Sequence, residues 1–379
     1  MEGIRMRAAW IEVDLEALRK NIRYLKSKIG PTTKFMAVVK ANAYGHGMCP
    51  VAQILREEGC DQFAVALVQE GVLLRENGFQ EPILVLGHVF PEEYQQILAH
   101  NLSVSIDTLE QAEELNDVAL QFGSRISIHL KIDTGMGRLG FLPNQSSLEQ
   151  ICEILKLPGL MVDGIFTHFA TAPQISDTSY CWHQFHLFEE FLKELEKKEV
   201  HIPLRHASNS GAAILFPQMQ LDMIRPGTAL YGLYPGEELE GQAGISLTPV
   251  LSVKAKLARV KPVPSGTRVS YSSTFTTKCP STLGVVPMGY VDGIFRSLAN
   301  KGEVLLHGQR CPMVGNICMD QFVIDITHIE NPKVGDEVVI IGKQGTEEIT
   351  AEEIGRKAGT ISIEILCDLG ERMPIHYLN

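Results

Sequence analysis

The sequence lacks any uninterrupted apolar segment close to the ~20 residues that a helix needs to cross a membrane. Residues 1–5 also lack the apolar core of a secretory signal peptide. Basic residues are a minority, because 34 Lys and Arg stand against 45 Asp and Glu and give a net charge of −11. Nucleic acid is therefore not expected as the main partner, since binding phosphates needs clustered Lys and Arg. These features predict a cytoplasmic protein that acts on neither membranes nor nucleic acids.

The sequence has no closely spaced cysteine pair. Its eight cysteines include no Cys-x-x-Cys motif, so neither a zinc site nor a disulfide framework is predicted. His183 and His186 are three residues apart on an expected helix and could bind a metal, but no third ligand follows in register. A solvated helix face is the favoured interpretation, and no metal site is predicted.

The first two thirds of the 379 residues alternate between short apolar segments and helical patterns. The segments expected as strands are 35–39, 63–67, 82–86, 103–106, 126–131, 164–167, 204–207 and 223–224. The helical patterns between them include 69–77, 108–122, 147–156 and 180–198. This alternation is typical of βα units and predicts an α/β fold, a (β/α)8 TIM barrel over residues 12–243.

From about residue 244 the pattern changes to Val-rich strands separated by turns. We expect a mainly β domain over residues 244–379, to which residues 1–11 could add a strand. One helix should interrupt it, because Thr350 and Glu353 form a capping box and Gly359 follows its end. The potentially reactive groups of this domain, each of which also has an ordinary structural interpretation, are Tyr271, Tyr290, Arg296, Cys318, Met319 and Asp320.

One apolar strand runs directly into a lysine. Residues 35–39 precede Lys40, and a turn containing Gly45 and Gly47 follows. Desolvation at the dry end of a buried strand lowers the pKa of a lysine and frees its nitrogen as a nucleophile, for which Schiff-base formation is one use. Alternatively, Lys40 only ends the strand and reaches water, which is the commoner arrangement of a lysine.

Polar groups also gather at other strand ends. Along residues 126–133 one face is apolar and the other carries Ser127, His129, Lys131 and Asp133, a row that destabilises a barrel unless its members are paired. Three further strands end with His168, His206 and Arg225. Because working residues of barrels lie at the carboxyl ends of strands, we expect these groups at one mouth.

The loops after the seventh and eighth strands contain Asn209, Ser210, Gly227 and Thr228. Barrel enzymes commonly bind phosphate with these two loops and a helix N-terminus. A phosphate there, with Lys40 across the mouth, is where a pyridoxal phosphate ring would lie.

Seven segments, in this order, resemble the alanine racemase family: 37–47, 129–140, 166–169, 225–227, 269–271, 289–293 and 318–321. The resemblance covers nearly the whole chain. It implies a pyridoxal 5'-phosphate enzyme that interconverts L- and D-alanine for peptidoglycan precursors, and a homodimer with shared active sites. A serine or broad-specificity racemase, a non-catalytic pyridoxal phosphate-binding protein and a related decarboxylase remain alternatives.

The resemblance also implies residue roles. Lys40 would hold the cofactor and act as one base, and Tyr271 of the partner subunit would act as the other. Arg225 would hydrogen-bond the pyridine nitrogen, with His168 linking Arg225 toward Tyr271. Arg138 and the Met319 backbone would hold the substrate carboxylate. The remaining cofactor contacts would come from Tyr44, Asn209, Ser210, Gly227 and Thr228, and support from Lys131, Tyr290, Arg296, Asp320 and Ile363.

Lys131 is carbamylated in many relatives, which is a hypothesis for this chain. The sequence also departs from the family pattern. Ile363 replaces a tyrosine that reaches the phosphate and narrows the entrance, Pro173 stands where an acidic residue is common, and Asn316 where a basic residue is common. We expect weaker cofactor retention and wider acceptance of small side chains, including that of serine.

Overall fold

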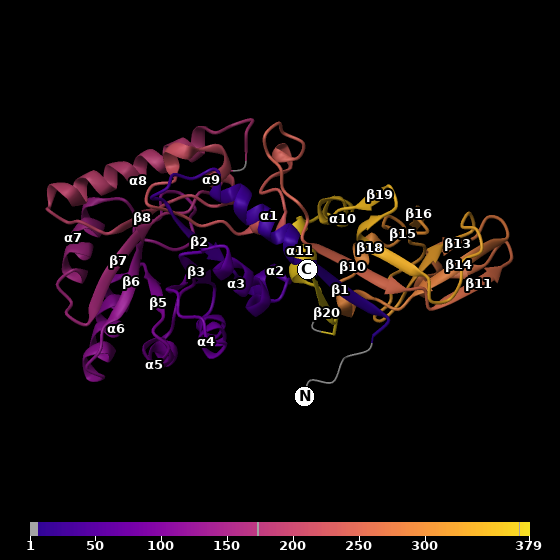
Figure 1. The fold of residues 1–379 in the computed structure, drawn as a ribbon, viewed down its shortest axis with the longest axis horizontal. Coiled ribbons are helices and arrows are strands. Elements are labelled where there is room, and N and C mark those ends of the chain that lie inside the picture. The colour runs from indigo at the N-terminus through magenta and orange to yellow at the C-terminus, as the bar shows by residue number, and fades with distance from the viewer. Residues whose placement is uncertain (1–6, 173, 371) are drawn as a thin grey trace. The chain divides into compact units, whose positions relative to one another are not determined.

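The computed structural model describes residues 7–172, 174–370 and 372–379, so Pro173 and residues 1–6 of the possible N-terminal strand lie outside it (Figure 1). The chain forms two compact units. The barrel unit comprises Arg19–Ala43 and Met48–Leu247. The β unit comprises the chain up to Leu18, Tyr44–Gly47 and Thr248–Asn379. The boundary expected between residues 243 and 244 stays a prediction.

The barrel unit contains eight parallel strands in the order β8-β7-β6-β5-β4-β3-β2-β9. They are β2 (Lys34–Val38), β3 (Gln62–Val65), β4 (Ile83–Val85), β5 (Ser103–Ile106), β6 (Ile126–Lys131), β7 (Leu160–Phe166), β8 (Leu204–His206) and β9 (Met223–Ile224). Backbone hydrogen bonds from Asp222 N to Arg205 O and from Arg225 N to Ser208 O join β9 to β8. The sheet is therefore closed, and the predicted (β/α)8 barrel is confirmed.

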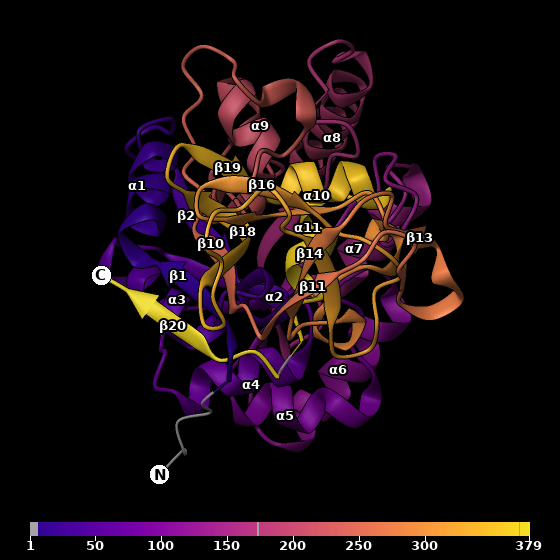
Figure 2. The same ribbon diagram turned by 90° about the vertical axis from the view of Figure 1, so that its right-hand side faces the viewer.

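Helices surround this barrel, and α4, α5 and α6 follow one another around its outside (Figure 1, Figure 2). The helices are α1 (Leu15–Lys26), α3 (Met48–Glu57), α4 (Val68–Glu76), α5 (Tyr94–Ala99), α6 (Leu109–Gln121), α7 (Gln145–Ile154), α8 (Ser179–Lys197) and α9 (Ser210–Leu215). Side-chain caps fix where α6 and α7 begin: Thr108 Oγ1 accepts from Gln111 N, and Asn144 Oδ1 accepts from Ser147 N. In the described chain, no helix combines the length and the apolar character that crossing a membrane would require.

The β unit is built on a sheet in the order β16-β15-β18-β10-β1-β20, with β19 paired to β18. These strands are β1 (Ala9–Asp14), β10 (Leu251–Lys256), β15 (Glu303–Leu306), β16 (Gln309–Pro312), β18 (Glu337–Gln344), β19 (Glu347–Ile349) and β20 (Ile375–Leu378). A three-stranded sheet contains β11 (Arg259–Val263), β14 (Ser281–Val286) and β17 (Phe322–Asp325), and a ribbon contains β12 (Arg268–Val269) and β13 (Phe275–Thr276). The predicted mainly β C-terminal domain is confirmed.

Two helices, α10 (Ala351–Ala358) and α11 (Ser362–Cys367), accompany these strands. Thr350 Oγ1 accepts a hydrogen bond from Glu353 N at 3.1 Å, and Gly359 has a φ of 83° after the end of α10. Glycine adopts this left-handed conformation without a steric penalty. The helix expected from the capping signal therefore forms where the sequence places it.

Candidate active site

The carboxyl ends of the barrel strands carry the groups that the sequence suggested. Lys40 lies two residues after β2, Lys131 ends β6 and His206 ends β8. His168 lies two residues after β7, and Arg225 directly follows β9. Because parallel strands end at the same edge of a closed sheet, these five residues share one face of the barrel.

The backbone after Lys40 winds in the left-handed sense. Ala41, Asn42 and Ala43 have φ values of 52°, 52° and 55°, and the buried Tyr44 follows with a φ of 53°. Each such L-residue costs about 1–2 kcal/mol relative to the right-handed conformation. Backbone strain of this kind persists only where the surrounding structure holds it, and it concentrates at functional sites.

Two side chains hold this turn, which is α2 (Lys40–Tyr44). The Glu70 carboxylate of α4 accepts a hydrogen bond from Ala41 N at 2.5 Å and another from Ala66 N at 2.7 Å. Asn42 Oδ1 accepts from Met48 N at 2.8 Å, at the start of α3. These contacts fix the point where the chain leaves β2 and thereby the position of Lys40.

Arg225 is a buried guanidinium whose partners are all neutral within the described chain. Its Nη2 donates to Thr167 O at 2.8 Å and to Ala207 O at 3.1 Å, and approaches His168 Nδ1 at 3.4 Å. Its Nη1 lies 2.8 Å from His206 Nδ1. Burial lowers the pKa of Arg225 to about 9, so the side chain keeps its charge at neutral pH.

Positive charge accumulates around these groups. Burial, and then the charges of Arg225, Arg138, Lys131 and Lys40, lower the pKa of His168 to about 3. Burial, and then Arg138 and Arg225, lower the pKa of Lys131 to about 8. Like charges disfavour one another at short range, so an anionic ligand would stabilise the positive charges that contribute to these shifts.

Arg138 lies in a loop organised by Asp133. The Asp133 carboxylate accepts hydrogen bonds from the backbone N–H groups of Gly135, Gly137 and Arg138 at 2.9, 3.0 and 3.0 Å. Burial alone would raise the pKa of Asp133, but these N–H groups lower it below its ordinary value. The exposed Arg138 side chain is therefore carried on a fixed backbone.

The two candidate phosphate loops are tied together by Ser210. Its Oγ accepts from Gly227 N at 2.9 Å and from Ala229 N at 3.3 Å, and Thr228 begins the short helix η3 (Thr228–Tyr231) between them. Asn209 uses its side chain as a helix cap, because Oδ1 accepts from Ala212 N. The Asn209 side chain therefore caps α9, a role that was not predicted from the sequence.

Tyr271 is strongly exposed on the β unit, with 71% of its surface accessible. Three neighbours, Ser270, Ser272 and Ser273, have φ values of 63°, 59° and 48°. Asn316 Nδ2 donates to Tyr271 O at 2.8 Å, and Asn316 O accepts from Ser270 Oγ at 2.6 Å. The Tyr271 phenol is therefore accessible to another molecule, while hydrogen bonds hold its backbone in place.

The remaining candidate residues of the β unit are Tyr290, Arg296, Met319, Asp320 and Ile363. Tyr290 N donates to Cys318 O at 3.0 Å, and Val291 N donates to Met319 O at 3.2 Å. Arg296 places its Cζ 6.0 Å from the centre of the Tyr290 ring. Asp320 accepts from Arg372 Nη2 at 2.9 Å, and Ile363 is half-buried on α11.

Comparison with known proteins identifies the chain's relatives. A sequence model of the alanine racemase N-terminal domain matches residues 13–235, and one of the alanine racemase C-terminal domain matches residues 250–377. The chain belongs to the alanine racemase family. The resemblance stated from the sequence motifs is thereby confirmed.

Curated relatives and solved structures of this family match over nearly their full length. Alanine racemase from Methanococcus maripaludis is 47% identical and covers 98% of each chain. Alanine racemase from Clostridium difficile 630 has a TM-score of 0.94 at 37% identity and covers 98% of this chain and 96% of that chain. The alanine racemase structure from Bartonella henselae, with covalently bound pyridoxal phosphate, has a TM-score of 0.88 at 29% identity and covers 98% and 100%.

Compared with the family's sequence motifs, the structure adds residues that the sequence did not single out. Glu70 holds the turn after Lys40, and Thr167 and Ala207 accept from Arg225 through their carbonyl groups. Backbone acceptors leave no side-chain signal in a sequence. A glutamate in the first turn of a helix, as Glu70 is in α4, has an ordinary capping interpretation.

Acidification is expected to destabilise the barrel unit well before its carboxylates titrate. Burial first, and then Arg225, lower the pKa of His129 and His168 to about 3 and that of His206 well below 6.5. At pH values between about 3 and the ordinary pKa of 6.5, these histidines are protonated in the unfolded chain and remain neutral in the folded chain. The free energy of unfolding should therefore fall as the pH falls, by on the order of 1 kcal/mol per histidine per pH unit.

Urea unfolding between about pH 7 and about pH 5 measures this slope. The variant His129→Asn removes one of the three rings and should show a smaller slope. A stability that stays constant across this range would contradict the neutral, buried state of these histidines.

Proposed function

We propose that this member of the alanine racemase family is a pyridoxal phosphate-dependent racemase that interconverts L- and D-alanine. One observation carries the proposal. The carboxyl-terminal face of the barrel contains both Lys40, on a strained turn, and Arg225, a buried arginine whose hydrogen-bond partners in the described chain are neutral. The relatives support the substrate, because proteins named alanine racemase match 98% of this chain.

The donor groups of the barrel fit pyridoxal phosphate. Lys40 offers the amine for covalent attachment. The two loops are tied together by Ser210 Oγ, which accepts from Gly227 N and Ala229 N, and the hydroxyl groups of Ser210 and Thr228 would donate to a phosphate there. Burial, and then neighbouring positive charges, lower the pKa values of His168 and Lys131, and the positive charges suit an anionic ligand. When bound, pyridoxal phosphate delocalises the negative charge left on the substrate carbon after its proton is removed.

Arg225 would face the pyridine nitrogen of this cofactor. A guanidinium donates hydrogen bonds, and Arg225 keeps its proton at neutral pH, so Arg225 would leave that nitrogen unprotonated. An unprotonated ring withdraws electrons less strongly than a pyridinium beside a carboxylate. Arg225 would thereby favour rapid return of the proton over side reactions such as transamination.

Racemisation needs a base on each face of the substrate carbon, because the proton leaves from one side and returns on the other. Lys40 would serve one face, and Tyr271 of the partner subunit would serve the other. The exposure of Tyr271 and the hydrogen bonds that fix its backbone support a role across a homodimer interface. Arg138 and the Met319 backbone would hold the substrate carboxylate.

Lys131 is expected to carry a carbamate. Burial and two arginines lower its pKa to about 8, so much of the amine is neutral near that pH. The neutral nitrogen attacks carbon dioxide, a C–N bond forms, and a proton passes to solvent, which leaves an anion beside Arg138 and Arg225. With ¹³C-bicarbonate, the protein should show a carbamate NMR signal that Lys131→Ala lacks. A signal that persists in Lys131→Ala would contradict the assignment.

The proposed function is tested by incubating the protein and pyridoxal phosphate with L-alanine or L-serine in D₂O. The expected result is a nearly equal mixture of alanine enantiomers with deuterium at the α carbon. Because Ile363 stands where relatives carry tyrosine, measurable serine racemisation is also expected. Absence of both α-exchange and D-alanine would overturn the proposal, and negligible kcat/KM for serine would reject only the wider specificity.

A further inference from the structure

A chain of three buried side chains leads away from the proposed pyridine contact into the barrel. His206 Nδ1 lies 2.8 Å from Arg225 Nη1, and His206 Nε2 lies 2.8 Å from His129 Nδ1. The accessible fractions of Arg225, His206 and His129 are 4%, 0% and 2%. His129 belongs to the polar row of β6, and neither the cofactor nor the substrate roles proposed above include it.

The chemistry of these groups fixes the direction of each hydrogen bond. A guanidinium only donates, so His206 Nδ1 must accept from Arg225 and carries no proton. A neutral imidazole then has its proton on Nε2, and His206 Nε2 must donate to His129 Nδ1. By the same rule, His129 has its own proton on Nε2. Every hydrogen bond in this series of three side chains is therefore donated in the direction away from Arg225.

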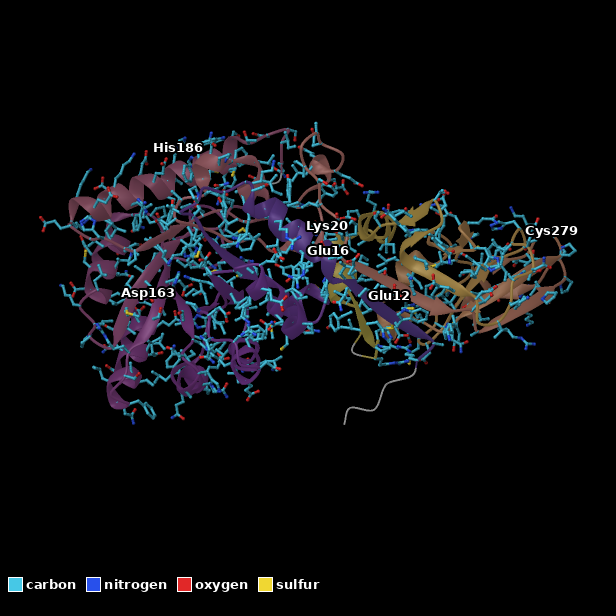
Figure 3. All side chains as sticks on the ribbon, in the orientation of Figure 1. Glu12, Glu16, Lys20, Asp163, His186 and Cys279 are labelled. Atoms are coloured by element: carbon cyan, nitrogen blue, oxygen red, sulfur yellow. The ribbon has the colours of Figure 1, made fainter. Side chains whose placement is uncertain are left out.

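His129, the last of these three hydrogen-bonded side chains, lines a cavity of about 500 Å³. Its lining comes largely from the amino-terminal parts of the strands and includes Lys34, Gln62, Ser103, His129, Asp163 and Asp222. Asp163 lies on β7, within the barrel strands (Figure 3). A polar cavity of this size is large enough for water, which would provide the acceptor that the Nε2–H of His129 requires.

The neighbouring strand is shaped around His129. Gly164 of β7 pairs with His129 of β6, and a Cβ at Gly164 would lie 2.3 Å from His129 Nδ1. The ring of His206 stacks on Phe166 with centroids 4.8 Å apart and planes 8° apart. Both rings are thus held in place, so the hydrogen bonds between them do not depend on side chains that rotate freely.

We propose that His129 is a positioning residue for Arg225. By accepting from His206 Nε2, it holds His206 in the tautomer whose Nδ1 lone pair faces the guanidinium. The series of hydrogen bonds would end at solvent in the cavity at the amino-terminal ends of the barrel strands. Removing this acceptor frees His206 to place its proton on Nδ1, where it would oppose an N–H of Arg225. The catalytic consequence rests on the proposed function, whereas the tautomer does not.

Nitrogen NMR on ¹⁵N-histidine-labelled full-length protein with pyridoxal phosphate tests the first step. We expect His206 to be unprotonated at Nδ1, with a coupling across the hydrogen bond between His206 Nε2 and His129 Nδ1. A proton on His206 Nδ1 in the unmodified protein would overturn the proposal. This measurement needs no variant and no racemase activity, so a failure of the proposed function would not obscure it.

Two substitutions test the second step. His129→Asn places an amide oxygen near the position of Nδ1 and keeps the acceptor, whereas His129→Leu removes it. We expect kcat for alanine to fall about tenfold in His129→Leu, with KM nearly unchanged and His206 no longer in one tautomer, and His129→Asn to recover most of kcat. If His129→Leu keeps kcat and the His206 tautomer, the pair is only structural and the proposal is wrong.

Discussion

Replacing Lys40 with alanine is expected to lower the rate of alanine racemisation by about 10⁴-fold or more. The substitution removes the amine proposed to attach the cofactor and, at the same time, one of the two proposed bases. The rate is measured from the enantiomer ratio at early times with saturating pyridoxal phosphate. Borohydride reduction followed by peptide mass analysis should locate the cofactor on Lys40 in the unmodified protein.

Lys20 provides the matched control. It is an exposed lysine on α1 (Figure 3), and Lys20→Ala removes an equal charge from the same unit without touching the barrel mouth. Lys20→Ala should keep the rate of the unmodified protein. If Lys40→Ala retained more than about one hundredth of the rate, Lys40 would be neither the attachment point nor an essential base.

Replacing Tyr271 with phenylalanine is expected to lower racemisation by about 10³-fold. The loss should be asymmetric, because Lys40 can still remove the proton from the face it serves. In D₂O, one enantiomer should continue to exchange its α-proton while exchange of the other falls with the racemisation rate. Tyr24→Phe, which removes a phenol that donates to Gly244 O on the surface of the barrel unit, is the control. Equal loss of exchange from both enantiomers would contradict the two-base assignment.

Mixing the two inactive variants tests whether sites are shared between subunits. In a heterodimer of Lys40→Ala and Tyr271→Phe chains, a shared arrangement leaves one site with both groups intact. A random mixture should therefore recover about one quarter of the original activity, since half of the dimers have one intact site of two. No recovery in a verified heterodimer would place both bases in one chain.

The barrel was predictable because its strands and helices leave local signals. The helical pattern over residues 108–122 became α6 (Leu109–Gln121), and Thr108 supplies the cap that marks its start. The short helix α5 (Tyr94–Ala99) was not predicted, because its six residues present less than two turns of apolar periodicity.

The internal details of the site depend on contacts that the sequence does not display. The polar row of β6 predicted a need for partners, yet His206, the partner of His129, lies 77 residues away in the chain. Asn42 is a residue type that adopts the left-handed conformation more readily than most, but Ala41 and Ala43 favour a helix or strand. Tertiary contacts such as that of Glu70 therefore select the turn. The roles of Lys40 and Tyr271 came from family motifs and remain to be tested by the variants above.

The turn after Lys40 also has a stereochemical consequence. With φ and ψ near 50°, Ala41 and Ala43 adopt the mirror image of an ordinary helix, the conformation in which a D-residue is relaxed. The penalty there belongs to the chirality of the residues and not to their size. A semisynthetic chain with D-alanine at these two positions would therefore keep the same backbone and lose the strain. At these positions, D-alanine, the proposed product of the enzyme, would fit the protein's backbone better than the L-alanine that it contains.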